Sequence, residues 1–287
     1  MRGRNYIKTT LLLASLSGLL VLAGSAFGTR GMTIALVFAA LMNLGAYFWS
    51  DKLALRASRA QPVTEAQAPE LYRIVRRIAD SAGIPMPRIH VTPSPQPNAF
   101  ATGRNPRHAA IAVTQGLLQI LDERELEAVL AHELAHVLNR DILIASVAAT
   151  IGAAITYLAQ FALFFGGGGD DDDGGNPFIA LIMFLLAPLA AMIIQMAVSR
   201  SREFGADATG AELIHDPIAL ASALAKIEAY ARGKPPATTN PATSHLFISN
   251  PFKGGRVAGM ARLFSTHPPT EERIARLQAM AYGRPLS

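Results

Sequence analysis

Four long stretches of the 287-residue chain contain no Asp, Glu, Lys or Arg. They cover residues 9–29, 31–50, 142–169 and 174–199 and hold 21, 20, 28 and 26 residues. Because a helix needs about 20 mostly apolar residues to cross a bilayer, each stretch is long enough for one crossing. Four buried helices of a soluble protein are the alternative, but uncharged runs of this length are rare in soluble folds. We therefore predict four transmembrane helices.

The same stretches explain why the chain as a whole carries few charges. Charged residues make up 16% of the chain, against about 25% in an ordinary soluble domain. Outside the four stretches the charged share is about 24%, close to that ordinary value. The sequence therefore predicts a chain in four parts: two N-terminal transmembrane helices in residues 9–50, a polar part in 51–141, a transmembrane hairpin in 142–199, and a second polar part in 200–287.

Basic residues near the ends of the predicted helices indicate their orientation, because cytoplasmic flanks are enriched in Lys and Arg. One side of the predicted membrane carries nine basic residues, and the other carries Arg30 and the acidic run at residues 170–173. We therefore predict both termini and both polar parts in the cytoplasm, with a short outside loop at residues 166–175. The nine basic residues are Arg2, Arg4, Lys8, Lys52, Arg56, Arg59, Arg140, Arg200 and Arg202.

The first apolar stretch also resembles a secretory signal peptide, since basic residues precede it and Gly24-Ser25-Ala26 follows its apolar run. We favour an uncleaved helix because a second apolar stretch follows almost at once. Either interpretation delivers residue 31 to the outside, so the predicted topology is the same.

Composition excludes several other classes of function. The absence of cysteine removes disulfides, thiol nucleophiles and cysteine zinc sites. The net charge of +5 could suggest nucleic acid as a partner. However, the basic residues lie at membrane edges and on predicted helix faces, and no basic patch interleaved with aromatic residues is present, so we predict no nucleic-acid binding.

Periodicity and capping signals predict the secondary structure of the polar parts. Apolar residues at helical spacing predict a helix over residues 69–82, and alternation predicts strands at 88–92, 98–102 and 109–113. Asp122 and Glu125 form a capping-box pair at the start of the next helix. Further helices are expected at 201–213, 217–231 and 268–282, and an irregular loop at 233–260. We therefore predict a mainly α fold, with four transmembrane helices and a cytoplasmic α+β domain that contains a small sheet.

The predicted helix after Asp122 contains the sequence His-Glu-Leu-Ala-His at residues 132–136. Histidines four residues apart project from one helix face, so His132 and His136 can bind one metal ion. Glu133 lies beside them, where a carboxylate can take a proton from a zinc-activated water. Two surface histidines without a metal are the alternative, but helical context makes metal binding the better interpretation.

A catalytic zinc ion needs a third protein ligand. Downstream candidates are His215, His245, His267 and several carboxylates. Glu203 is favoured because His136 precedes the predicted hairpin by six residues and Glu203 follows it by four, so the hairpin returns Glu203 to the same membrane face. Asp207, one helical turn further, could hold a histidine N–H. Without the histidine pair, Glu203 would be interpreted as a charge paired with Arg200 or Arg202.

The chain resembles the HtpX family of membrane-bound zinc proteases, which is related to the membrane proteases that process prenylated proteins. The resemblance rests on the four apolar stretches, HELAH at 132–136, SREFGAD at 201–207 and STHPP at 265–269. It implies a zincin-like endopeptidase domain with one zinc ion per chain, held by His132, His136 and Glu203, with Glu133 as the catalytic residue. It also implies a location in the bacterial inner membrane and a role in degrading damaged or misassembled membrane proteins under stress.

Two further residues are weaker candidates. The resemblance places His267 near the active site, where it could stabilise an oxyanion, although it could equally cap the last helix. Asn98 begins a strand that resembles the substrate-binding edge of related metalloproteases, or it belongs to an ordinary strand. We treat His90, His108, His215 and His245 as structural or surface residues.

We therefore predict that the protein hydrolyses peptide bonds with a zinc-activated water and Glu133 as general base. Its expected partners are polypeptides, membrane-protein substrates and the lipid bilayer; the oligomeric state is not predicted. A membrane metal sensor or holdase would need the same ligands but not Glu133. A transporter is disfavoured because no predicted span carries an ionisable residue of the kind that marks an ion path.

Overall fold

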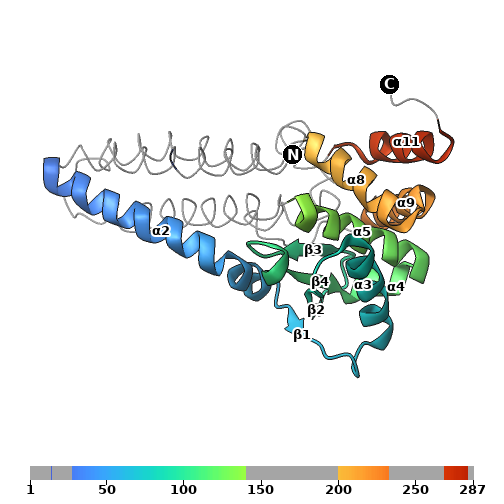
Figure 1. Ribbon diagram of the computed structural model, residues 1–287, viewed down its shortest axis with the longest axis horizontal. Helices are drawn as coiled ribbons and strands as arrows, with labels where there is room; N and C mark the ends of the chain where they lie inside the picture. Colours follow the sequence, from blue (N-terminus) through green and yellow to red (C-terminus); the bar gives the residue numbers. More distant parts are fainter. Residues whose placement is uncertain (1–13, 15–27, 140–199, 233–267, 284–287) are drawn as a thin grey trace, which may run out of the picture.

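The structure is a computed structural model that describes residues 28–139, 200–232 and 268–283, together with residue 14 (Figure 1). Apart from residues 14, 28 and 29, the predicted transmembrane stretches 9–29, 142–169 and 174–199 lie outside the described residues. The predicted outside loop at 166–175, the predicted loop at 233–260 and His267 also lie outside them.

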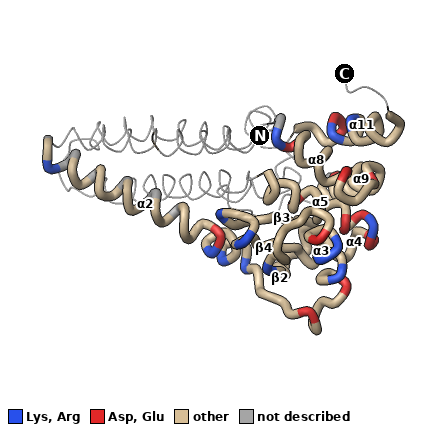
Figure 2. Tube along the Cα trace, in the orientation of Figure 1, with Lys and Arg blue, Asp and Glu red and all other residues tan. Residues whose placement is uncertain are grey.

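Helix α2 (Gly28–Ala57) contains the second uncharged stretch. It extends away from the sheet and the other described helices, and it carries charged residues only towards its two ends (Figures 1 and 2). Large apolar side chains along it are exposed, among them Ile34, Leu36, Val37, Phe38 and Leu41. Within the described part of the chain, no helix combines the length and the apolar character that a membrane crossing requires. The four transmembrane helices therefore remain a prediction.

Helix α3 (Pro69–Ala82) is the amphipathic helix that the periodicity predicts. Pro69 occupies its first turn, where a missing N–H costs no intrahelical hydrogen bond. Gly83 ends the helix in the left-handed conformation, with φ of 62°, and its N–H donates to the carbonyls of Ala79 and Asp80. The buried face consists of Leu71, Ile74, Val75, Ile78 and Ala79.

A four-stranded mixed sheet has the order β1-β2-β4-β3. Its strands are β1 (Gln61–Pro62), β2 (Arg88–Thr92), β3 (Ala99–Thr102) and β4 (Ala110–Thr114). β2 and β4 are parallel, and the other two pairs are antiparallel. The three predicted strands are confirmed to within one residue at each end, whereas β1 was not predicted. β3 lies at one edge of the sheet, and the site described below lies beside it.

Helix α5 (Glu123–Asn139) begins with the predicted capping box. The N–H of Glu125 donates to Oδ1 of Asp122 at 2.9 Å, and the N–H of Asp122 donates to Oε2 of Glu125 at 3.1 Å. Glu125 also accepts hydrogen bonds from Ser222 and Lys226 of α9 (Pro217–Arg232), each at 2.6 Å. The start of the helix that carries the histidine pair is therefore fixed to α9.

Helices cover both faces of the sheet. The main core joins one face to α3, α5 and α9, and Leu134, Ile111 and Leu220 are among its fully buried side chains. A smaller cluster on the opposite face joins Leu55 of α2 to Phe100, and Arg88 of β2 forms a 2.9 Å ion pair with Asp51 of α2. The described fold is mainly helical with a small mixed sheet, as predicted. Its remaining helices are α4 (Gln115–Ile120), α8 (Arg200–Ile214), α11 (Thr270–Ala281) and the 3-10 turn Pro106–His108.

Gly210 allows α8 to approach α5 closely at the level of His132. A Cβ atom on Gly210 would lie 2.8 Å from the backbone nitrogen and 2.9 Å from Cα of His132. Both atoms belong to the backbone, so no change of rotamer could relieve the contact. The close approach of α8 to α5 therefore requires a residue without a side chain at position 210.

We expect Gly210→Ala to lower the free energy of unfolding by about 1–3 kcal/mol, the usual cost of overpacking, because α8 must move away from α5. Thermal denaturation of the purified protein measures the change. Gly205→Ala is the matched control on the same helix, since a Cβ there meets no atom within 4 Å. It should be neutral or gain up to about 1 kcal/mol from helix propensity. Equal melting temperatures for both variants would contradict this account.

Candidate metal centre

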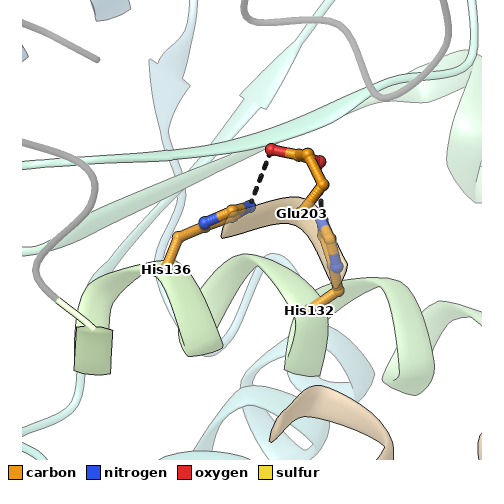
Figure 3. Close-up of side chains that lie close together, drawn as sticks. All are labelled: His132, His136 and Glu203. Carbon is orange, nitrogen blue, oxygen red and sulfur yellow. Dashed lines mark ion pairs between the residues drawn. The ribbon is translucent and has the colours of Figure 1, made fainter. Parts of the chain in front are cut away.

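Helices α5 and α8 bring His132, His136 and Glu203 together, although Glu203 is distant from the histidines in the sequence (Figure 3). The two imidazoles lie one turn apart on α5, with ring centroids 4.8 Å apart. Nε2 of His136 lies 3.6 Å from Oε1 of Glu203, and Nε2 of His132 lies 3.8 Å from Oε2. Both rings therefore face the same carboxylate.

These three side chains fit a metal ion. In tetrahedral zinc sites the protein ligands lie about 2.0–2.2 Å from the ion, so two ligand atoms are separated by roughly 3.4 Å. The two nitrogen–oxygen distances here, 3.6 and 3.8 Å, are close to that separation. One ligand atom from each residue lies within 4.8 Å of the others. Two imidazoles and one carboxylate form a donor set that leaves a fourth position for water or substrate.

Asp207 lies one turn after Glu203 on α8 and contacts the far side of the His132 ring. Its Oδ1 lies 2.9 Å from Nδ1 of His132. An ionised carboxylate only accepts hydrogen bonds, so Nδ1 carries the proton and the Nε2 lone pair is left for a metal. Burial alone would raise the pKa of Asp207, but the nearby guanidinium of Arg273 and the hydrogen bond from His132 lower it well below its usual value. Asp207 is therefore a carboxylate at neutral pH.

Arg273, in the first turn of α11, is a member of the site that the sequence analysis missed. Its Nε donates to Oδ2 of Asp207 at 2.8 Å, and its Nη2 donates to Oδ1 at 2.6 Å. The residue is only 1% exposed. A signal was present, because Thr270, Arg273 and Leu277 have helical spacing and form the buried stripe of α11. The signal was overlooked because an arginine in a helix is usually assigned to the solvent-exposed face.

Glu133 is buried between the histidine pair and the edge strand β3. Its Oε2 accepts a hydrogen bond from the backbone N–H of Ala101 at 3.0 Å. Burial raises the pKa of Glu133, and attraction to His132 and His136 offsets this only in part. A carboxyl group whose pKa is moved towards neutrality can both accept and release a proton.

Asn98, the predicted residue of a substrate-binding edge, immediately precedes β3 and is buried. Its carbonyl accepts a hydrogen bond from the N–H of Thr114 at 2.9 Å, so its backbone continues the pairing of β3 with β4. Its own N–H donates to the Thr114 hydroxyl at 2.8 Å. Asn98 thus lies at one end of the strand that contacts Glu133 through Ala101, while His267 lies outside the described residues.

His90 is buried on β2, and burial lowers its pKa. It is not part of the group formed by His132, His136 and Glu203. Its role as a structural residue stays a prediction.

Comparison with known proteins extends the resemblance to most of the chain. The sequence model of the family "Peptidase family M48" matches residues 65–281. A "Protease HtpX homolog" of Ralstonia pickettii (strain 12J) is 54% identical over 280 residues, which cover 96% of this chain and 97% of that protein. A protein of the same name from Burkholderia mallei (strain SAVP1) is 53% identical with the same coverage.

The fold is similar to that in the crystal structure of S. mikatae Ste24p, with a TM-score of 0.55. The sequence identity is 21%, and the match covers 96% of this chain and 65% of that chain, which is just under two thirds. This likeness concerns the fold alone, and the family match and the close relatives carry the assignment. The resemblance to HtpX proteases is thereby confirmed, and the chain belongs to peptidase family M48 and is a metallopeptidase.

Proposed function

We propose that the protein is a membrane-integral zinc endopeptidase in which Glu133 is the general base. His132, His136 and Glu203 hold one zinc ion per chain, and Asp207 orients His132. The observation that carries this proposal is the position of Glu133. This buried carboxylate lies next to the three side chains suited to metal binding, and it accepts a hydrogen bond from the edge strand β3. A site that only stores or senses a metal has no need of such a carboxylate.

The chain's own residues supply the proton transfers. When bound, zinc is a Lewis acid that lowers the pKa of a water molecule towards about 7 and polarises the scissile carbonyl. Glu133 accepts the proton of the attacking water at its carboxylate and passes it to the leaving amine nitrogen. The raised pKa of Glu133, caused mainly by burial, suits both steps. His267 is proposed as a donor to the developing oxyanion.

The substrate is proposed to bind as an extended chain along β3. Among the described strands, β3 has β4 on one side, and its Ala101 N–H points to Glu133 on the other. Adding a strand to a sheet edge uses backbone hydrogen bonds, which form with extended polypeptide of any sequence. The segment that begins at Asn98 would therefore select unfolded polypeptides over folded ones.

Metal removal tests this function. We expect the purified full-length protein in detergent to cleave an unfolded, casein-like substrate, and we expect 1,10-phenanthroline to abolish cleavage because zinc is then removed. Adding zinc back after removal of the chelator should restore the activity. A protein that binds zinc but leaves the substrate intact would instead be a sensor or holdase, and cleavage that resists chelation would contradict the zinc mechanism.

We further propose that the protein lies in the bacterial inner membrane with its active site in the cytoplasm and that it degrades damaged or misfolded membrane proteins under stress. The four uncharged stretches and the bias of basic residues support this proposal. The exposed apolar side chains of α2 are also compatible with lipid contact.

The proposed topology can be tested with reporter fusions. A reporter active only outside the cytoplasm should be active when fused within residues 170–173 and inactive when fused after residue 60. The reverse pattern, or extraction of the protein from membranes by alkaline carbonate, would contradict the proposal.

A further inference from the structure

Arg273 is among the most deeply buried charged residues of the described chain, and it belongs to a different segment from the proposed ligands. It lies in the first turn of α11, 141 positions after His132. Burying a guanidinium is costly unless it is paired and hydrogen-bonded. Asp207 supplies that pairing with both carboxylate oxygens, at 2.8 and 2.6 Å.

The charge of Arg273 is directed at Asp207 and not at the imidazole. Its Nη2 atom lies 3.5 Å from Nδ1 and 3.4 Å from Nε2 of His132, so the guanidinium lies beside the ring at similar distances from both nitrogens. The hydrogen bond from the same atom to Asp207 is shorter, at 2.6 Å. Arg273 therefore contacts the ring by packing and acts on it through Asp207.

We propose that Arg273 is a positioning residue for the metal site, and that the site is fully organised for zinc only when α11 is docked against α8. The proposal rests on the proposed function in one respect, which is that the ion is held by His132, His136 and Glu203. The order of contacts runs from Arg273 to Asp207, from Asp207 to Nδ1 of His132, and from Nε2 of His132 to the metal.

The two-point contact explains how a residue without metal contact can act on metal affinity. Two parallel N–H···O bonds from a planar guanidinium fix the rotation of a carboxylate, which a single ammonium group cannot do. Asp207 Oδ1 accepts from both Arg273 and His132, so fixing the carboxylate also fixes the plane of the imidazole. Partners of this kind are typically worth about 10- to 100-fold in metal affinity.

A second arginine of α11 provides a matched control. Arg276 lies over the ring of Phe204, with its Cζ atom 3.9 Å from the ring centroid, and so links α11 to α8 without touching Asp207. Its side chain is 37% exposed, and it also forms an ion pair with Glu272. Removing Arg276 takes away one partly exposed contact between α11 and α8 and leaves the bonds between Arg273 and Asp207 in place, whereas removing Arg273 releases Asp207.

The test is the zinc dissociation constant of the full-length protein in detergent, measured by competition with a chromophoric chelator. Arg273→Ala should bind zinc about 10- to 100-fold more weakly, the range expected for loss of such a partner. Arg273→Lys, which keeps the charge but not the two-point contact, should lose about 10-fold. Arg276→Ala should stay within about twofold of the unaltered protein, as expected for a half-exposed contact. The melting temperature of each metal-free variant is measured in parallel.

A double variant separates positioning from general destabilisation. If Arg273 acts through Asp207, adding Arg273→Ala to Asp207→Ala should cause no further loss of zinc affinity, because residues in one network are not additive. Losses that simply add, or equal losses in the Arg273→Ala and Arg276→Ala variants, would overturn the proposal.

Two other results also decide the question. If Arg273→Ala does not fold, Arg273→Lys decides alone, and an affinity equal to that of the unaltered protein overturns the proposal. A protein that binds zinc with the expected dependence on Arg273 but cleaves no substrate would refute the proposed proteolysis and leave the role of Arg273 intact. An unaltered protein that binds no zinc would overturn both.

Discussion

Replacing Glu133 with Gln should lower the rate of peptide hydrolysis by about 10²–10⁴-fold, the usual contribution of a general acid–base. Glutamine has nearly the same shape, and its amide oxygen can still accept the hydrogen bond that Ala101 donates to Glu133. An amide cannot take a proton from water, so the loss falls on the chemical step. The measurement is kcat/KM on an unfolded substrate, together with the zinc content of the variant, which should stay at one ion per chain.

Glu127→Gln is the control for this experiment. Glu127 lies on the same helix, has an 18% exposed side chain and forms a 2.8 Å ion pair with Arg77. Such pairs contribute little, about 0–1 kcal/mol, so activity should be close to that of the unaltered protein. If Glu133→Gln kept full activity in purified protein, Glu133 would not be the general base.

Glu203→Ala should remove both metal and activity. Structural zinc sites with four ligands bind with about 10–16 kcal/mol, so one ligand contributes about 2.5–4 kcal/mol and its loss weakens binding about 10²–10³-fold. The two histidines alone would leave the ion with half of a tetrahedral shell. Zinc content after gel filtration, measured by elemental analysis, and proteolysis of an unfolded substrate both report the effect.

Glu212→Ala provides the comparison, since Glu212 is an exposed glutamate further along α8. It should retain the zinc content and the activity of the unaltered protein. Stoichiometric zinc in the Glu203→Ala variant would show that another residue is the third ligand.

The local signals in the sequence were reliable where they depended on nearby residues. The spacing of Leu71, Ile74 and Ile78 predicted α3, and the pair Asp122 and Glu125 predicted a capping box whose two hydrogen bonds both form. These features depend on contacts within one or two helical turns, which a sequence pattern records directly. The pairing order of the strands depends on contacts between distant segments, so the two-residue β1 and the position of β3 at the edge had no local signal.

The same distinction between local and long-range contacts applies to the residues of the candidate site. The spacing of His132 and His136 defines one helix face, and counting the predicted membrane crossings brought Glu203 to it, where the structure also has it. Arg273 could not be predicted by either argument. Its burial depends on Asp207, a residue 66 positions away, and an arginine without a known partner is expected at the surface.

The three proposed ligands are unequally exposed, which has a consequence for the rate of metal exchange. The side chains of His132 and Glu203 are 3% and 5% exposed, whereas that of His136 is 16% exposed. An ion would therefore enter and leave past His136, and the other two ligands would release it only when the packing between α5 and α8 opens. The rate of this opening depends on the protein and not on the chelator concentration. The residence time of the metal would then be set by the protein's own fluctuations, and raising the chelator concentration would accelerate zinc loss only up to that limit.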